Sequence, residues 1–159
     1  MGKVQVIAEP GSHEVTLVRE FNAPRELVFK AYTDPELIPQ WWGLRSSTTV
    51  VDKFEAKQGG IWRYVQHETN GEQYAFSGVF HQVKAPERLV YTFEFEPMEG
   101  HILMETITLE ARDGRTIMTD SSVFQTVADR DGMIQSGMEW GANESMDQLD
   151  ELLETLKGT

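Results

Sequence analysis

Two acidic residues, Glu105 and Asp120, stand in segments whose other positions alternate between apolar and polar side chains. Such alternation is typical of β-strands, in which successive side chains point to opposite faces of the sheet. An Asp-Gly turn at 113–114 sets Leu109 opposite Met118, and this register puts both acids on the apolar, inward face. A carboxyl group buried there has a raised pKa, so it can act as a general acid or base, or as a polar anchor for a ligand.

The segment 88–96 is expected to extend this inward face, because its odd positions are large and apolar. A turn near 98–100 would place Phe93 opposite Glu105 and Tyr91 opposite Ile107, while the turn at 113–114 places Glu105 opposite Ser122. The predicted inward face therefore carries Tyr91, Phe93, Glu105, Ile107, Asp120 and Ser122. A one-residue bulge is the alternative, since it would turn one or both carboxylates outward.

No other set of residues has the spacing of a catalytic or metal site. The four histidines, His13, His67, His81 and His101, share neither an i,i+4 pairing nor a strand face, so no metal site is predicted. The chain has no cysteine, GxSxG elbow, P-loop or GxGxxG fingerprint, and no cofactor is expected. The only enzyme-like constellation is Glu105, Asp120 and Tyr91. No catalytic residue is assigned, because a ligand anchor explains the same side chains.

These residues require a sheet to position them, and the pattern predicts an α+β fold in a single domain over residues 1–159. The expected strands are Glu14–Phe21, 48–54, 61–67, 73–83, 88–96, 102–111 and 115–124. Two short helices are predicted after the first strand, over 24–33 and from 34 to about 42, and one long helix over 129–157. The architecture would be a seven-stranded curved antiparallel sheet wrapped around the long C-terminal helix. Residues 1–13 form an N-terminal extension in which 4–8 can add a short extra strand.

The apolar stripe of the long helix changes character along its length. Its second half is leucine, at Leu149, Leu152, Leu153 and Leu156, whereas its first half presents Ile134, Met138, Gly141, Ala142 and Ser145. Small side chains cannot fill the space beside them, which indicates a core that continues into a cavity. Close contact between helix and sheet at Gly141 and Ala142 is the alternative.

Aromatic residues are expected to line this cavity on the side of the sheet. Trp62, Tyr64, Phe76 and Phe80 make the more aromatic face of their strands, and Trp41 or Trp42 lies where the two short helices meet. The predicted cavity residues are Trp62, Tyr64, Phe76, Phe80, Tyr91, Phe93, Glu105, Ile107, Asp120, Ser122, Met138, Gly141 and Ala142. A site of this composition would bind a small apolar or amphipathic molecule.

The net charge of −12 argues against nucleic acid and anionic membrane surfaces as partners, because like charges repel. The N-terminus lacks the apolar run of a signal peptide, and no segment is long enough to cross a membrane. A cytoplasmic protein without membrane insertion is therefore expected. Trp140 is expected on the outward side of the last helix, where it lies on a neighbouring loop or anchors self-association or a partner contact.

Several motifs, in order along the chain, resemble those of a known family. They are Ala23-Pro24-Arg25-Glu26-Leu27-Val28-Phe29, Gln40-Trp41-Trp42-Gly43, Gly59-Gly60-Ile61-Trp62-Arg63, Ala85-Pro86-Glu87-Arg88-Leu89-Val90-Tyr91 and Ser136-Gly137-Met138-Glu139-Trp140-Gly141. Together they resemble the activator of heat-shock-protein-90 ATPase homologue family, within the START-like (SRPBCC) superfamily. The resemblance implies a helix-grip fold with a cavity for hydrophobic or amphipathic ligands such as lipids. It also implies that a few relatives catalyse cyclisation or hydrolysis there.

The sequence departs from the family pattern at two positions. Many relatives carry a tryptophan where this chain has Ala142, and an apolar residue where it has Asp120. Both departures would enlarge the cavity and make it more polar. The leading interpretation is a non-enzymatic binder of a small apolar or amphipathic molecule. The alternatives are a chaperone-associated or regulatory interaction module, and a cyclase- or hydrolase-type enzyme that uses the cavity carboxylates.

Overall fold

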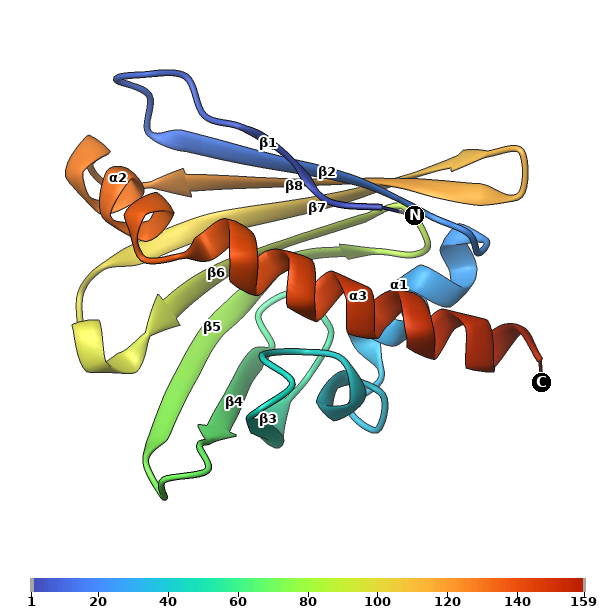
Figure 1. The fold of residues 1–159 in the computed structure, drawn as a ribbon, viewed down its shortest axis with the longest axis horizontal. Helices are drawn as coiled ribbons and strands as arrows, with labels where there is room; N and C mark the ends of the chain where they lie inside the picture. Colours follow the sequence, from blue (N-terminus) through green and yellow to red (C-terminus); the bar gives the residue numbers. More distant parts are fainter. Residues whose placement is uncertain (1, 159) are drawn as a thin grey trace.

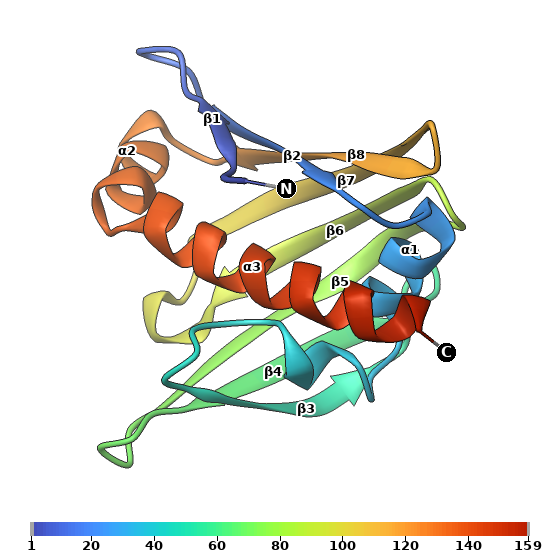
Figure 2. The same ribbon diagram turned by 45° about the vertical axis from the view of Figure 1, so that its right-hand side comes forward.

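The computed structural model describes residues 2–158, and within this range the chain forms an eight-stranded antiparallel sheet (Figure 1, Figure 2). The strands are β1 (Gln5–Ile7), β2 (Glu14–Phe21), β3 (Thr48–Phe54), β4 (Ile61–His67), β5 (Gln73–Lys84), β6 (Arg88–Phe95), β7 (Ile102–Arg112) and β8 (Arg115–Phe124). Their order is β1-β2-β8-β7-β6-β5-β4-β3. Strands β3 to β8 pair with their neighbours in sequence, and β2 pairs with β8, so that β1 and β3 form the two edges of the sheet.

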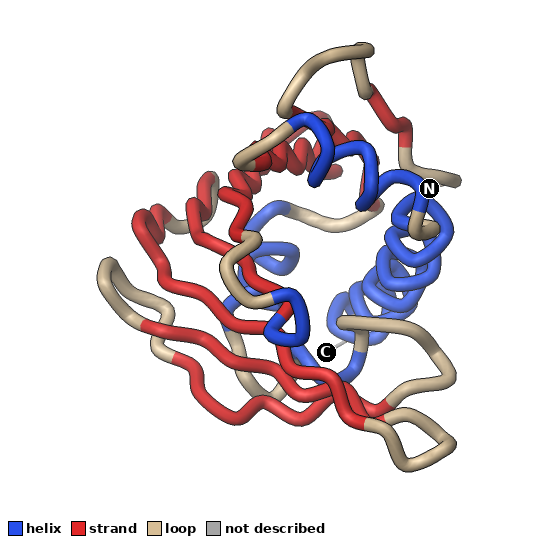
Figure 3. The backbone as a smooth tube through the Cα atoms, turned by 90° about the vertical axis from the view of Figure 1, so that its left-hand side faces the viewer, coloured by secondary structure: helices blue, strands red, loops and turns tan. Residues whose placement is uncertain are grey.

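The helices lie on one face of this sheet, which curves around them (Figure 3). They are α1 (Arg25–Thr33), α2 (Val127–Gln135) and α3 (Met138–Lys157), with short 3-10 turns η1 (Ile38–Gln40) and η2 (Glu96–Met98). Helix α3 crosses the sheet, and α1 lies beside its C-terminal half (Figure 2). The α+β class and the curved antiparallel sheet are therefore as predicted.

The predicted number of strands was seven, and the eighth is β1, which the sequence offered only as a possible addition. It pairs antiparallel with β2 at the edge of the sheet. Just before it, the Val4 backbone N–H donates to Asn143 Oδ1 on α3 at 2.9 Å. The N-terminal segment is thus attached both to the sheet and to the last helix.

The single long helix predicted over 129–157 is wrong, because the chain breaks between α2 and α3. Gly137 takes a left-handed conformation with φ of +94°, which a continuous helix does not permit. The first of the two helices also begins before the predicted start, at Val127, where Thr126 accepts a hydrogen bond from the Asp129 N–H. Arg130 then fixes the direction of α2, since its buried guanidinium donates to the carbonyl of Glu9 at 3.0 Å.

The second short helix predicted after the first strand is also wrong. The chain there forms only the 3-10 turn η1. Pro39 lies within it, lacks a backbone N–H, and disfavours the helical conformation of the residue before it. The turn nevertheless buries Trp41, whose indole N–H donates to the Ala31 carbonyl of α1 at 2.9 Å.

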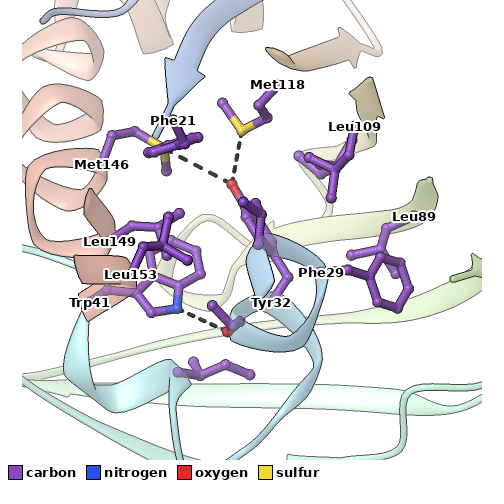
Figure 4. Packing of buried hydrophobic residues seen from close by; sticks show 14 of the residues in the cluster. Phe21, Phe29, Tyr32, Trp41, Leu89, Leu109, Met118, Met146, Leu149 and Leu153 are labelled. Carbon is purple, nitrogen blue, oxygen red and sulfur yellow. Dashed lines mark hydrogen bonds between the residues drawn. The ribbon is translucent and has the colours of Figure 1, made fainter. Parts of the chain in front are cut away.

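The C-terminal half of α3 closes a solid core against α1 and the sheet (Figure 4). Leu149 and Leu153 are 0% and 1% exposed and pack among Phe21, Val28, Trp41, Leu89, Leu109 and Met118. The Tyr32 hydroxyl lies at the edge of this core and donates to Met118 Sδ at 3.0 Å. Of the leucine half of the helix, Leu149, Leu152 and Leu153 are therefore buried and Leu156 is half-buried against the same core, as the stripe predicted.

Candidate functional site

A cavity of about 840 Å³ separates the N-terminal half of α3 from the sheet. On the helix side its lining is Met138, Gly141, Ala142, Ser145 and Met146, followed directly by the solid core. The predicted division of the helix into a hollow half and a packed half is thus present. Met146 was missed by the prediction, although it is buried at the boundary between the two halves.

Hydrogen bonds hold this half of α3 to the loop after η1. The Ser145 hydroxyl donates to the Trp41 carbonyl at 3.1 Å, and the Gln148 amide donates to the Gly43 carbonyl at 2.7 Å. Gly141 is not pressed against any backbone, since a Cβ built there would meet only the Leu44 side chain at 3.9 Å. The small residues of α3 therefore leave open space, and the alternative of close helix–sheet contact at Gly141 does not hold.

Aromatic rings form the wall opposite the helix. Trp62 lies 4.8 Å from Tyr64 and 5.7 Å from Phe93 between ring centroids, and Phe76 lies 5.7 Å from Phe93. Trp42 joins the cluster edge-on, 5.0 Å from Tyr64. Such offset and edge-on pairs are favourable and hold the rings in fixed positions. The wall is therefore rigid and largely apolar.

Gly78 on β5 makes the position of Trp62 possible. Trp62 reaches across its neighbouring strand, and its indole N–H donates to the Thr92 carbonyl of β6 at 3.2 Å. A Cβ at Gly78 would lie 1.8 Å from that carbonyl oxygen and 2.6 Å from the indole nitrogen. Glycine is thus required for the indole to reach this carbonyl.

The two carboxyl groups lie where the parity of the strands predicted, on the inward face of the sheet. The register between β7 and β8 is the predicted one, with Ile107 opposite Asp120 and Glu105 opposite Ser122. The register between β6 and β7 was predicted wrongly by two residues, since Tyr91 rather than Phe93 lies opposite Glu105. An even shift leaves every side chain on its predicted face, and no bulge interrupts β7 and β8 near the acids.

Burial raises the pKa of both carboxyl groups. For Asp120, removal from water is the largest cause, and the charge of nearby Glu105 raises its pKa further. For Glu105, burial again dominates, while hydrogen bonds from Asp120 and Tyr91 oppose the rise in pKa. The two groups therefore titrate together and hold a proton to higher pH than free carboxyl groups would. We call Glu105 and Asp120 the carboxyl pair.

One oxygen of this pair has no partner among the described residues. Asp120 is 9% exposed, and its Oδ1 atom is buried without a hydrogen bond. The Ser122 hydroxyl stabilises the same carboxyl group and lowers its pKa, but it does not outweigh the effect of burial. A buried oxygen without a donor is unfavourable by about 1–3 kcal/mol, so this position is costly to the fold.

Three tyrosine hydroxyls surround the carboxyl pair from different elements. Burial is the largest cause of the raised pKa of Tyr32, Tyr64 and Tyr91, and the negative charge of Glu105 adds to it. These hydroxyls therefore stay neutral. They offer hydrogen bonds rather than charge to anything bound in the cavity.

The mouth of the cavity lies between α2 and the segment that joins η2 to β7. Met98 and Ile102 line it and are 54% and 39% exposed. His101 Nδ1 lies 3.0 Å from Asp129 Oδ1 on α2, so this contact connects the two sides of the mouth. No pattern in the sequence indicates this pair, because the break at Gly137 that separates α2 from α3 was not predicted.

Eleven of the thirteen predicted cavity residues line the cavity: Trp62, Tyr64, Phe76, Phe80, Tyr91, Phe93, Glu105, Asp120, Met138, Gly141 and Ala142. Ile107 and Ser122 share the inward face but do not line it. Ile107 is 1% exposed within the core beneath the cavity, and Ser122 contacts Asp120 from the side. The lining residues that the sequence did not indicate include Leu17, Tyr32, Leu103 and Met133.

Neither a metal centre nor a membrane-spanning helix is found in the described part of the chain. Over residues 2–158, no three histidine, aspartate or glutamate side chains are grouped so as to hold a metal ion. In the same range, no helix is both long enough and apolar enough to cross a membrane.

A curved antiparallel sheet, a long C-terminal helix and a cavity between them define a START-like, or SRPBCC, protein. A structure from Rhodobacter sphaeroides matches with a TM-score of 0.89 at 26% identity, covering 97% of this chain and 99% of that chain. One from Arthrobacter aurescens matches with a TM-score of 0.87 at 26% identity, covering 97% and 93%. One from Staphylococcus epidermidis matches with a TM-score of 0.81 at 28% identity, covering 92% and 93%.

Within this class, residues 22–154 match the family described as activator of Hsp90 ATPase homolog 1-like protein, and the chain belongs to that family. A comparison with curated proteins gave no match.

Proposed function

We propose that the protein binds a small hydrophobic or amphipathic molecule in the cavity between the sheet and α3. The cavity itself carries the proposal. Its volume of about 840 Å³ falls within the range of small-molecule sites, about 300–1,000 Å³. Its lining combines aromatic and aliphatic side chains with a few polar groups, which is the usual composition of such sites.

The energetics of packing support the same conclusion. Protein interiors are close-packed, and an unfilled apolar space lowers stability. Here the lining positions Gly141, Ala142 and Ser145 on α3 carry small side chains, and at Gly141 a Cβ would meet nothing nearer than the Leu44 side chain at 3.9 Å. A ligand that occupies the space would restore the missing contacts, and the folds of this family and superfamily commonly take hydrophobic ligands.

The test is a variant that fills the cavity from the helix. Ala142→Trp places an indole in the open half, where Ala142 is half-buried and lines the cavity. The wild type should bind the neutral dye Nile red with a rise in fluorescence, and Ala142→Trp should lose most of this binding while its melting temperature stays equal or rises. Native mass spectrometry of the freshly purified wild type should also show a co-purified small molecule that Ala142→Trp lacks.

The matched control is Glu139→Trp, which adds the same side chain to the exposed face of the same helix. It should bind Nile red as the wild type does. Equal dye binding by wild type and Ala142→Trp would place the dye elsewhere and contradict the proposal.

A contact with a partner protein is a second candidate function, and one observation favours it. Trp140 on α3 is 65% exposed and does not lie back on its own chain. Exposed tryptophans are frequent at the energetic centres of interfaces. If this surface serves the chaperone after which the family is named, purified Hsp90 should co-sediment with the wild type and not with Trp140→Ala. Co-sedimentation of both proteins to the same extent would remove Trp140 from this role.

A further inference from the structure

The carboxyl pair gives the cavity a chemical preference beyond apolarity. Glu105 on β7 and Asp120 on β8 both line it, and Asp120 is 9% exposed with an unpartnered Oδ1 atom. A buried acceptor without a partner is unfavourable, and a donor on a bound molecule beside this carboxyl group would offset that cost. The inference that follows rests on the proposed function, because it concerns the ligand of that same cavity.

No lysine or arginine among the described lining residues compensates the charge of the carboxyl pair. The charged and titratable lining residues other than the tyrosines are Glu68, His101, Glu105, Asp120 and Asp129, and no lysine or arginine is among the lining residues of 2–158. His101 lies at the mouth and contacts Asp129. The site is therefore acidic and has no lysine or arginine in its described lining to pair with a carboxylate or phosphate.

The nearest buried guanidinium on the inward face belongs to Arg19 of β2, and it is engaged elsewhere. Its Nη1 atom lies 2.9 Å from Asp147 and its Nη2 atom 3.6 Å from Asp150, both on α3. Arg19 lies opposite Met118, two residues from Asp120 along β8, and is not part of the cavity lining. Its charge is thus compensated by α3 and not by the carboxyl pair.

The aromatic wall favours a cation at the same place. Tyr91 lies directly opposite Glu105 in the sheet, and its ring is 5.9 Å from that of Trp62. The faces of tyrosine and tryptophan attract cations, and the attraction is stronger where water is excluded. An acidic pair beside aromatic rings is a combination that recognises ammonium groups.

We propose that the ligand is a lipophilic amine, whose primary or secondary ammonium group donates to Asp120 and Glu105 while its apolar part lies between the aromatic wall and α3. The Asp120 carboxyl group would accept one N–H, and the Glu105 carboxylate would accept another. A neutral alcohol could donate only one hydrogen bond and would leave the pair uncompensated. A fatty carboxylate would meet two acids and no cation.

Matched probes test this preference directly. Decylamine, 1-decanol and decanoate share one alkyl chain and differ only in the head group. By calorimetry near pH 8 and at moderate salt, the wild type should bind decylamine about ten- to a hundredfold more tightly than 1-decanol, as expected for hydrogen bonds to charged groups. Decanoate should bind most weakly of the three.

Substitutions assign the preference to the carboxyl pair. Asp120→Asn and the double variant Glu105→Gln/Asp120→Asn keep the volume and remove charge, so they should lose most of the preference for decylamine and still bind 1-decanol. Glu110→Gln is the control, because Glu110 lies on the same strand β7 with an exposed side chain. It should behave as the wild type, since general attraction to an acidic protein does not depend on the cavity.

Proton release provides a second readout that needs no variant. The groups facing the carboxyl pair are Tyr32 from α1, Tyr64 from β4, Tyr91 from β6 and Ser122 from β8, and none of these carries a charge near neutral pH. A bound ammonium group would stabilise both carboxylates, so decylamine should displace up to about one proton per molecule from the pair. Calorimetry in two buffers of different ionisation enthalpy measures this release, and 1-decanol should show none.

The outcomes separate the two proposals. Binding of 1-decanol as tight as that of decylamine would overturn the amine assignment and leave a hydrophobic site in place. Absence of binding by all three probes would overturn both. A preference for decylamine that persists in the double variant, or that disappears at high salt in the wild type, would show attraction by the surface charge and refute the role of the carboxyl pair.

Discussion

The substitution Asp120→Asn should change how the stability of the protein depends on pH. In the folded chain, burial holds the pKa of Asp120 and of Glu105 above their ordinary values, which are about 3.9 and 4.3. The folded state therefore keeps a proton that the unfolded chain has already released. Because the native state binds more protons, the free energy of unfolding must fall as the pH rises above about 4, until the pair loses its proton.

The magnitude follows from the number of protons. One proton retained by the native state gives a slope of about 1.4 kcal/mol per pH unit, or about 2.7 kcal/mol over two units. Asparagine keeps the size of Asp120 and offers Glu105 a permanent N–H donor in place of the titrating proton. Asp120→Asn should therefore be about as stable as the wild type near pH 4 and progressively more stable as the pH rises, until the wild-type pair loses its proton.

Urea denaturation followed by tryptophan fluorescence, at several pH values between 4 and 8, measures the two curves. Glu96 and Glu151 have lowered pKa values because arginines contact them, so their stabilising effect is lost only as the pH falls. That effect is common to both proteins and cancels in the difference between the curves. Asp113→Asn, in the exposed turn between β7 and β8, is the control and should run parallel to the wild type. A parallel curve for Asp120→Asn as well would refute the retained proton.

Two further predictions concern the cavity wall and the surface. Gly78→Ala should lower the free energy of unfolding by about 2–4 kcal/mol, because the added methyl group overpacks against the Thr92 carbonyl and a hydrogen bond is lost. Gly141→Ala should raise the free energy of unfolding by up to about 1 kcal/mol, because only the Leu44 side chain is near. Urea denaturation of both variants measures this, and the reverse order of stability would contradict the reasoning. If Trp140 anchors self-association, sedimentation should show a wild-type dimer that strengthens with added salt and a monomeric Trp140→Ala, and monomers for both at every salt concentration would exclude this contact.

The inward face of the sheet could be predicted because its periodicity is two and most of its turns are short. The two-residue Asp113-Gly114 turn fixes the register of β7 against β8, and the structure has the predicted pairs. The connection between β6 and β7 is longer and contains the 3-10 turn η2, so the position at which the chain reverses cannot be read from the residue types alone. The register there was missed by two residues, yet Glu105 stayed on the predicted face because the error was even.

The break between α2 and α3 could not be predicted from the same kind of pattern. A glycine such as Gly137 is tolerated within a helical periodicity, so the apolar stripe runs through it without a signal. The direction of α2 depends on a tertiary contact, because Arg130 donates to the carbonyls of Glu9 and Glu14, more than a hundred positions away in the sequence. The mouth of the cavity depends on this turn, and so His101 and Asp129 were missed with it.

Asp120 is the position where the requirements of the fold and of the proposed function diverge. An apolar side chain there would be favourable for folding, because it would remove a buried oxygen without a donor, at about 1–3 kcal/mol. The carboxyl group instead lies beside Glu105, whose charge raises the pKa of Asp120 beyond the effect of burial. Neighbouring residues offset only part of this, since Tyr91 and Ser122 are neutral and Arg19 is held by α3. Positions where a sequence departs from a rule of folding without a compensating contact are expected at functional sites. At Asp120 the missing contact is a hydrogen-bond donor, and the ammonium group of the proposed ligand would supply one.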